Sequence, residues 1–479
     1  MSSLKQKSVV GIAWALTEQF GIYLIKFVIG IILARLLTPE DFGLVGMIMV
    51  FFAVAEVFVN SGFGAAYVHK KDATDADANT IFFTNLFISL VLYIILYFGA
   101  PWIASFYERP ALTVLTRVMG LVVVINAFNI IQQAQIVRDV NFKRKAKVTV
   151  TATLISGTAG ITSALMGMGV WALVIQSMAN RAFIAAGLWI TTRWTPKWEF
   201  SFTLFRELFA FGSWILFSSV IRKIFDNIYI LAIGKFFPAA QVGFYTKAKQ
   251  FERLASENLA GAIGRVAFPV YAKLQDDKPR LRNGMRKFIQ HSMILLVPML
   301  IGLIVVAEPF VILLLKEKWA PMIPYLQLMC IIGILYPINM VNIQAMTAQG
   351  KSRLSFKLSL LRNGLRIVNI AVMYRFGVFY IILGEAVISL VAFVVDSWFS
   401  NRLVAYGFKK QTGDISKILT GGIIAGAIAY LPNLVTENLY ILFFSGVLLT
   451  ASVFLLSQYV YNRKLLMNTI ELKNHFSKK

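Results

Sequence analysis

Four basic residues lie in the middle of long apolar stretches, where ionisable groups are rare. They are Lys26, Arg222, Lys249 and Arg253. An ionisable group in hydrocarbon is costly, so it usually faces a partner or a water-filled cavity. Ammonium and guanidinium groups pair well with phosphate or carboxylate. These residues are therefore predicted to line a substrate-binding cavity for an anionic cargo.

Carboxylates occur on the same or neighbouring stretches, at Glu18, Glu56, Asp226 and Glu252. Intramembrane carboxylates can bind a coupling proton or sodium ion, and we keep that role open for all four. Structural charge pairing stays open as well, because Arg222 and Asp226 stand four residues apart on one predicted helix. Farther along the chain, Arg362 and Arg366 are predicted to be interfacial.

No other group of residues suggests catalysis or a resident metal. The sequence contains no P-loop, and its single cysteine and three scattered histidines have no metal-ligand spacing. We therefore predict that the protein is not an enzyme and carries no cofactor, apart from a coupling H⁺ or Na⁺.

The composition is that of a membrane protein, with 58% hydrophobic and 15% charged residues over 479 positions. A net charge of +24 would suggest nucleic-acid binding in a soluble protein. In a membrane protein, lysine and arginine gather in cytoplasmic loops, so no nucleic-acid partner is predicted.

The elements that must position the charges are long apolar helices. Each predicted span can cross a hydrocarbon core of about 30 Å. The all-α fold is predicted to contain about fourteen transmembrane helices, at 9–35, 42–67, 80–104, 111–137, 147–167, 170–192, 207–234, 241–268, 288–315, 322–346, 355–375, 379–404, 416–432 and 438–461. With the N-terminus inside, most loop lysines and arginines fall on the cytoplasmic side, which predicts that both termini are cytoplasmic.

An internal repeat divides the chain. Ile31–Gly46 resembles Ile230–Gly243, and Gly169–Leu173 resembles Gly377–Ile381. Related segments are six spans apart, so the repeats are predicted to be parallel, as in many transporters.

The repeat gives four predicted regions: an N-terminal six-helix lobe (1–192), a linker (193–206), a C-terminal six-helix lobe (207–405) and two extra helices with a basic cytoplasmic tail (406–479). The linker contains aromatic and basic residues. It is predicted to be either an amphipathic segment on the cytoplasmic face or a partly buried connector.

The turn Leu33–Gly43, with Gly169–Leu173 and the approach to the seventh span at Leu208–Gly212, resembles the bacterial polysaccharide transport family. This family belongs to the MOP superfamily, and the likeness is greatest to Wzx-type exporters of lipopolysaccharide, colanic acid and teichuronic acid. The resemblance implies two MATE-like lobes in a V shape and a flippase for polyprenyl-diphosphate-linked oligosaccharides. It also implies the bacterial inner membrane, with membrane lipids, a polysaccharide polymerase and glycosyltransferases as partners.

Two other functions stay open at this point. A drug/cation antiporter of the same superfamily would be expected to have an acidic and aromatic cavity, whereas cations predominate here. A membrane glycan-modifying enzyme would be expected to have large outer loops with catalytic clusters, whereas the predicted outer loops are short and carry few charges.

Overall fold

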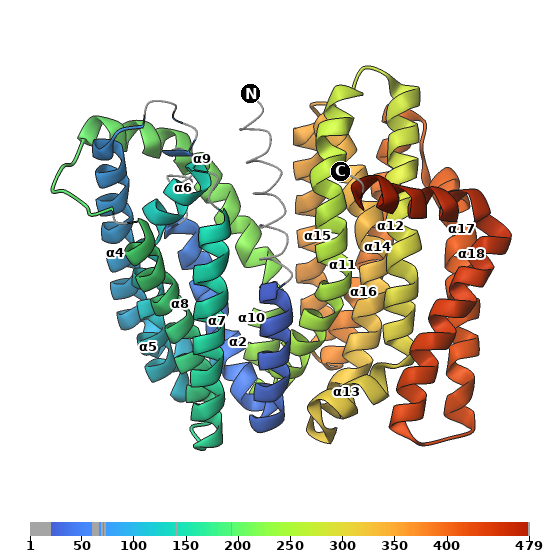
Figure 1. The fold of residues 1–479 in the computed structure, drawn as a ribbon, viewed down its shortest axis with the longest axis horizontal. Helices are drawn as coiled ribbons and strands as arrows, with labels where there is room; N and C mark the ends of the chain where they lie inside the picture. Colours follow the sequence, from blue (N-terminus) through green and yellow to red (C-terminus); the bar gives the residue numbers. More distant parts are fainter. Residues whose placement is uncertain are drawn as a thin grey trace. The chain divides into compact units, whose positions relative to one another are not determined.

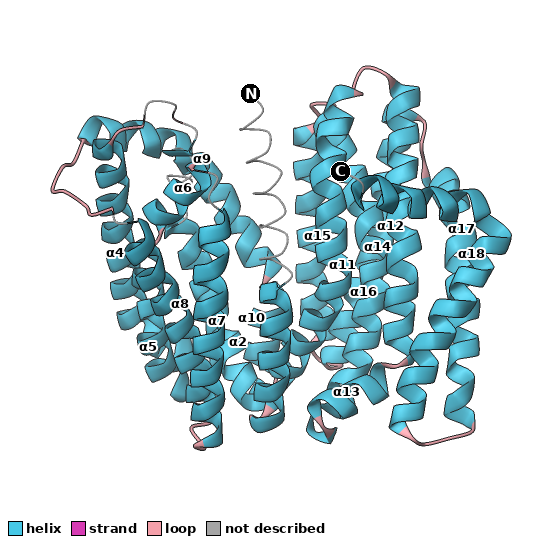
Figure 2. Cartoon of the chain, in the orientation of Figure 1, coloured by secondary structure: helices cyan, strands magenta, loops and turns pink. Residues whose placement is uncertain are grey.

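The computed structural model describes residues 21–59, 67–68, 70, 73–139, 142–192 and 194–477, and these form helices joined by loops (Figures 1 and 2). The side chains at 207–215, 257–263, 265–266, 464 and 468–477 are not described. The chain forms two compact units, unit 1 (Met1–Gly243) and unit 2 (Phe244–Lys479).

Unit 1 begins in the described chain with a helix at 21–36. The helices that follow are α2 (Pro39–Val59), α4 (Asp75–Tyr107), α5 (Ala111–Ala127), α6 (Ile130–Arg138), α7 (Phe142–Leu165), α8 (Val170–Thr192), α9 (Phe202–Asp226) and α10 (Ile228–Phe236). α2 lies against α5, α8 and α9, while α4 packs on α5 and α7 on α8.

Helix α11 (Ala239–Lys273) begins in unit 1 and continues into unit 2. The other helices of unit 2 are α12 (Lys278–Val305), α13 (Ala307–Leu315), η1 (Glu317–Met322), α14 (Ile323–Ala348), α15 (Ser352–Met373), α16 (Val378–Val404), α17 (Phe408–Tyr430), η2 (Leu431–Leu434) and α18 (Leu439–Ser477).

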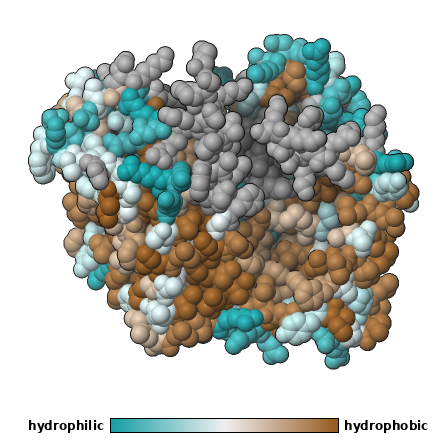
Figure 3. Space-filling model, in the orientation of Figure 1, coloured by the Kyte–Doolittle hydropathy of each residue, from teal (hydrophilic) through white to brown (hydrophobic). Residues whose placement is uncertain are grey.

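Ten segments of the described chain are long and apolar enough to cross a membrane, which makes this a multi-pass membrane protein. They coincide with ten of the fourteen predicted spans. The other four predicted spans are 9–35, 207–234, 241–268 and 355–375, and the first three contain the four cations predicted to line the cavity. On the face shown in Figure 3, hydrophobic residues cover the middle of the surface and hydrophilic residues gather toward its two ends.

Some predicted spans are two helices separated by a short break. Between α5 and α6, the indole nitrogen of Trp189 donates a hydrogen bond to the Phe128 carbonyl oxygen at 2.9 Å. Where a helix breaks inside a membrane, a backbone carbonyl loses its intrahelical hydrogen bond, so it needs another donor such as this one. Side-chain amides donate in the same way at two further breaks: Asn227 to the Lys223 carbonyl (2.8 Å) between α9 and α10, and Gln327 to the Ile304 carbonyl (3.2 Å) between α12 and α13.

The segment that enters α9 is fastened to the start of α4. The buried Asn79 side chain accepts the Lys197 backbone N–H at 3.0 Å and donates to the Glu199 carboxylate at 3.2 Å. Trp198 stacks on Phe83 but remains 93% exposed. The predicted linker thus has a fixed side and an exposed aromatic side, and its position on the cytoplasmic face stays a prediction.

The two copies of the internal repeat contact each other within unit 1. α2 begins at Pro39 and α11 at Ala239, so the repeat is offset by 200 positions at this point. A Cβ at Gly43 would overlap the Ala239 carbonyl, and a Cβ at Gly243 would overlap the Pro39 carbonyl. The contact is reciprocal, and its close approach requires glycine at both positions.

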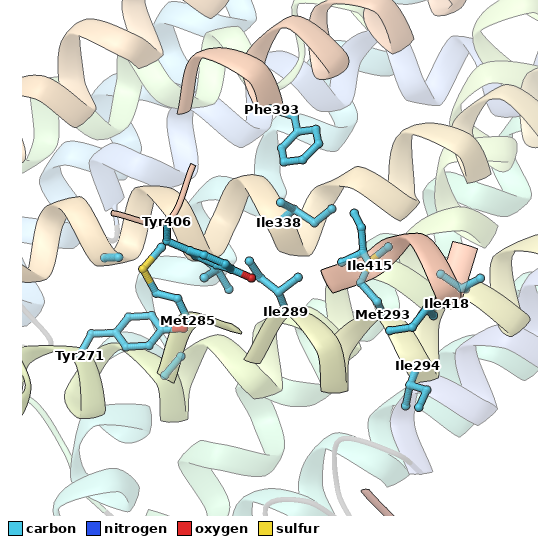
Figure 4. Close-up of a cluster of buried hydrophobic side chains, with 14 of the residues drawn as sticks. Tyr271, Met285, Ile289, Met293, Ile294, Ile338, Phe393, Tyr406, Ile415 and Ile418 are labelled. Atoms are coloured by element: carbon cyan, nitrogen blue, oxygen red, sulfur yellow. The ribbon is translucent and has the colours of Figure 1, made fainter. Parts of the chain in front are cut away.

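Unit 2 is built around α12, which packs against α14, α17 and α18. Figure 4 shows the buried cluster at this junction, where Met285, Ile289 and Met293 of α12 meet Ile338 of α14 and Ile415 of α17. α17 and α18 correspond to the two predicted spans that have no counterpart in the first half of the chain. They are packed components of unit 2.

Candidate functional site

Glu56 of α2 is the centre of a polar cluster inside unit 1. Its Oε1 accepts hydrogen bonds from the Asn126 side chain at 2.8 Å and from Arg181 Nη2 at 3.0 Å. The two partners come from α5 and α8, so three helices meet at one carboxylate. The side chains of Glu56 and Arg181 are 31% and 42% exposed, which leaves the ion pair accessible from one side.

Lys26, on the helix at 21–36, is close enough to Arg181 for electrostatic repulsion between the two cations. Among the described residues, the cluster thus combines the Glu56 carboxylate with the Arg181 guanidinium and with Lys26 near that guanidinium. Such an arrangement can hold an anion next to Lys26 and Arg181 while Glu56 neutralises part of the charge.

Arg222 and Asp226 lie near the end of α9, also in unit 1, and both side chains are exposed. The Arg222 guanidinium donates to the Ser219 hydroxyl at 3.2 Å. This bond to a neutral group on the preceding turn leaves the cation exposed on its helix.

In unit 2, Tyr245, Lys249 and Arg253 follow one another at intervals of four residues on α11 and thus share a face. Lys249 Nζ is 3.5 Å from the Tyr245 hydroxyl and 5.4 Å from the centre of its ring. Arg253 is exposed, Lys249 is half-buried and Tyr245 is buried. We call these three residues the α11 basic face.

Glu252 lies on a different side of α11. It is buried, accepts a hydrogen bond from the Ser256 hydroxyl, and packs so closely on α14 that a Cβ at Gly333 would overlap its carboxylate. This setting favours a packing role for Glu252.

Two ion pairs join α15 to α16. Arg366 contacts Glu385 through Nη2 (2.7 Å to Oε1) and Nε (3.1 and 3.2 Å to the two oxygens). Arg362 Nη1 lies 3.1 Å from Asp396 Oδ2. Arg362 and Arg366 are therefore paired with carboxylates of α16, and their interfacial setting stays a prediction.

The structure brings some predicted residues together. Lys249 and Arg253 share the α11 basic face in unit 2, and Lys26 lies near the Arg181 partner of Glu56 in unit 1. Arg222 and Asp226 are placed on α9 in unit 1. Glu18 lies outside the described residues. Binding and ion-coupling roles for these residues stay predictions.

Four partners of these charges are not indicated by the motifs of the sequence: Asn126, Arg181, Glu385 and Asp396. Glu385 and Asp396 could have been found, because each interrupts the otherwise apolar stretch 379–404. Asn126 carries no charge, and its role follows only from the packing of α5 against α2.

Comparison with known proteins gives the family. The model of a family described as "Polysaccharide biosynthesis protein" matches residues 32–324, more than half of the chain. The chain is 26% identical over 443 residues to the teichuronic acid biosynthesis protein TuaB of Bacillus subtilis, covering 91% of each chain. It is 25% identical over 376 residues to the lipopolysaccharide biosynthesis protein WzxC of Escherichia coli, covering 77% of this chain and 76% of WzxC.

Solved structures give the fold. The lipid II flippase MurJ in an inward closed conformation superposes with a TM-score of 0.76 at 15% identity, covering 95% of this chain and all of MurJ. An inward-facing multidrug MATE transporter of the MOP superfamily gives a TM-score of 0.59 at 16% identity, covering 83% of this chain and 98% of the transporter. The protein is therefore a membrane transport protein and not an enzyme, and it belongs to the polysaccharide biosynthesis family of Wzx-like proteins with the fold of MurJ and the MATE transporters.

Proposed function

We propose that this protein is a flippase for polyprenyl-diphosphate-linked oligosaccharide units. It moves them from the cytoplasmic to the outer leaflet of the bacterial inner membrane for the synthesis of a cell-surface polysaccharide. Family membership supports the link to polysaccharide synthesis. Glycosyltransferases would supply the lipid-linked unit, and a polymerase would consume it on the outer side.

The proposal includes fourteen spans in two parallel six-helix lobes, 1–192 and 207–405. The linker 193–206 joins the lobes, the two extra helices of 406–479 follow, and both termini are cytoplasmic. The matching starts of α2 and α11 support the repeat. The clustering of lysine and arginine in alternate loops supports the orientation. Rocking of the lobes would give alternating access to the two sides of the membrane.

The observation that carries the proposal is the α11 basic face, which lies on a helix that the sequence predicts to span the membrane. A diphosphate has several anionic oxygens, and lysine and arginine provide the charge-assisted hydrogen bonds that such a group needs. We assign Lys249 and Arg253, with Lys26 and Arg222, to the diphosphate of the cargo. The polyprenyl tail would stay in the lipid.

Transport would be coupled to an ion gradient through a membrane carboxylate that binds H⁺ or Na⁺. Of the predicted residues Glu18, Glu56, Asp226 and Glu252, Glu56 is best supported, because it is accessible and linked to two other helices through Asn126 and Arg181. Ion binding at Glu56 would weaken its bond to Arg181 and so loosen α8 from α2.

Charge reversal tests the cationic site. Arg222→Glu combined with Arg253→Glu should reduce export of surface glycan at least about 100-fold in a strain that lacks the natural gene, because two charge-assisted contacts become repulsive. A matched control is Arg353→Glu combined with Lys409→Glu, which reverses two exposed cations at the starts of α15 and α17 and should leave export intact. Normal export by the first double variant, at equal protein levels in the membrane, would refute the cationic site.

A further inference from the structure

The exposed side of α4 marks where lipid covers unit 1. This helix is long and apolar enough to span a membrane. Its exposed large apolar side chains begin at Phe87, continue almost to its end, and include Phe87, Leu90, Ile94, Phe98, Trp102 and Phe106. From Phe87 to Phe106 the rise of the helix is about 29 Å, which matches the ~30 Å hydrocarbon core of a bilayer. We call this surface the lipid band of α4.

The part of α4 that precedes the lipid band has a different character. It carries five buried polar side chains: Asp77, Asn79, Thr80, Thr84 and Asn85. The first turn is exposed at Asp75, and Lys70 forms an ion pair of 2.8 Å with Asp77. One edge of the hydrocarbon core therefore lies near Phe87, and the start of α4 lies outside it.

The segment that enters α9 is held at this edge on both sides of Trp198. The backbone N–H of Lys197 donates to the Asn79 side chain at 3.0 Å. The backbone N–H of Ser201 donates to the Thr80 hydroxyl, also at 3.0 Å. Figure 1 shows the loop that precedes α9 beside the end of α4. The position of this loop along α4 is thus fixed by two buried side chains.

The Trp198 ring continues the exposed surface of α4 beyond the lipid band. It stacks on Phe83 with ring centroids 4.8 Å apart. Phe83 precedes Phe87 by four residues, so the two side chains share a face of α4. The same spacing places Phe83 about 6 Å outside the lipid band. An indole at that depth is level with the lipid headgroups.

Three aromatic side chains of this segment are exposed: Trp198, Phe200 and Phe202. We call them the linker aromatics. Aromatic rings are enriched at the membrane–water interface, where an apolar body and a polar surrounding can both be accommodated. The surface runs without a break from the lipid band through Phe83 to Trp198, so the lipid that covers the band reaches the linker aromatics as well.

We propose that the linker aromatics bind the boundary between the headgroups and the acyl chains of the surrounding phospholipids. The segment between the two predicted lobes is then clamped, with α4 on one side and the bilayer on the other. The proposal goes beyond the transport function, because it depends neither on the cargo nor on which side of the membrane the linker occupies.

The depth of spin labels in vesicles tests the proposal. The only cysteine of the sequence, Cys330, is buried, and Cys330→Ala gives a background for single labelled cysteines. Labels are placed by Trp198→Cys or Phe200→Cys, and the full-length protein is reconstituted into phosphatidylethanolamine–phosphatidylglycerol vesicles. Power saturation then compares collisions with oxygen, which concentrates in hydrocarbon, and with a nickel chelate, which stays in water.

Two matched controls on α4 calibrate the depth. Phe98→Cys lies in the lipid band and should give high oxygen and low nickel accessibility, whereas Asp75→Cys lies at the exposed start of the helix and should give the reverse. The labels at 198 and 200 should fall between the controls, about 6 Å outside the hydrocarbon edge. If Cys330→Ala does not fold, Cys330 is retained, because its buried thiol is shielded from the label.

Three results would overturn the proposal. Nickel accessibility at 198 and 200 equal to that at 75 would place the linker aromatics in water, where a protein partner could cover them. Oxygen accessibility equal to that at 98 would place them inside the hydrocarbon. Low accessibility to both reagents would make the segment a connector buried in protein. None of these results bears on the cargo, so the flippase proposal is tested separately.

Discussion

Asn342 of α14 and Gln411 of α17 are completely buried, yet their polar groups are satisfied. The two side chains exchange hydrogen bonds of 3.0 and 2.9 Å, and Ser400 of α16 donates to the Asn342 oxygen at 2.6 Å. Gln411 also donates to the Tyr406 carbonyl at 2.9 Å. Polar groups that are removed from water need such partners, and here the partners tie α17 to the other helices of unit 2.

Gln411→Ala should therefore destabilise the protein by about 1–3 kcal/mol, because it leaves the buried Asn342 side chain without its amide partner. Thermal unfolding in detergent should show a fall of about 2 °C or more in the melting temperature. Asn433→Ala removes an amide bonded to a carbonyl at an exposed site and serves as the control. Equal melting temperatures for both variants would contradict this account of the network.

The sequence indicates which residues carry charge at membrane depth but not what they contact. Lys249 and Arg253 can be placed on one helix face from their spacing. Arg366 cannot be assigned to Glu385 in the same way, because the two residues belong to different helices and nothing in the spacing links them. Asn126 is beyond prediction for the same reason, since only the packing of α5 on α2 brings it to Glu56.

At the scale of helices, the starts of α2 and α11 form a close backbone contact between the two copies of the repeat. Gly43 and Gly243 each lie against a backbone carbonyl of the other helix, that of Ala239 and that of Pro39 respectively. Small residues permit such approaches in membrane proteins, and the energy comes from the close packing itself. Any side chain at either position must push the helices apart.

Gly43→Ala and Gly243→Ala should each lower stability by about 1–3 kcal/mol through overpacking and should reduce export. The double variant should cost less than the sum of the two, because both changes open the same contact. Melting temperatures and surface glycan levels measure both effects. Gly99→Ala, also in a helix, has open space at the added methyl group and should behave like the unmodified protein. Fully additive losses, or no loss at all, would contradict the reciprocal contact.

Most of the helices could be predicted from the length of their apolar segments. Two short turns between helices could be predicted from their glycines. Gly169 and Gly377 adopt φ of +52° and +113°, values that favour glycine, at the turns that precede α8 and α16. The helix breaks could not be predicted. The break after α5 depends on Trp189, which lies on α8 and reaches the Phe128 carbonyl only in the folded unit.

For the whole molecule, the central claim is directional transport of a lipid-linked glycan. Each unit combines an apolar exterior with an internal group of paired charges, around Glu56 in unit 1 and between α15 and α16 in unit 2. The repeat was visible in the sequence, whereas the ion pairs between helices were not. In unit 2 these include the Arg366–Glu385 and Arg362–Asp396 pairs, which join α15 to α16.

The leaflet that holds the lipid-linked glycan in cells lacking this protein tests that claim most directly. Spheroplasts with labelled sugars should accumulate the complete polyprenyl-linked unit on the cytoplasmic side, and re-expression of the protein should move it to the outer leaflet. Re-expression of the Arg222→Glu and Arg253→Glu double variant should fail to do so. An intermediate that reaches the outer leaflet without the protein, or normal surface polysaccharide with no accumulated intermediate, would contradict the account.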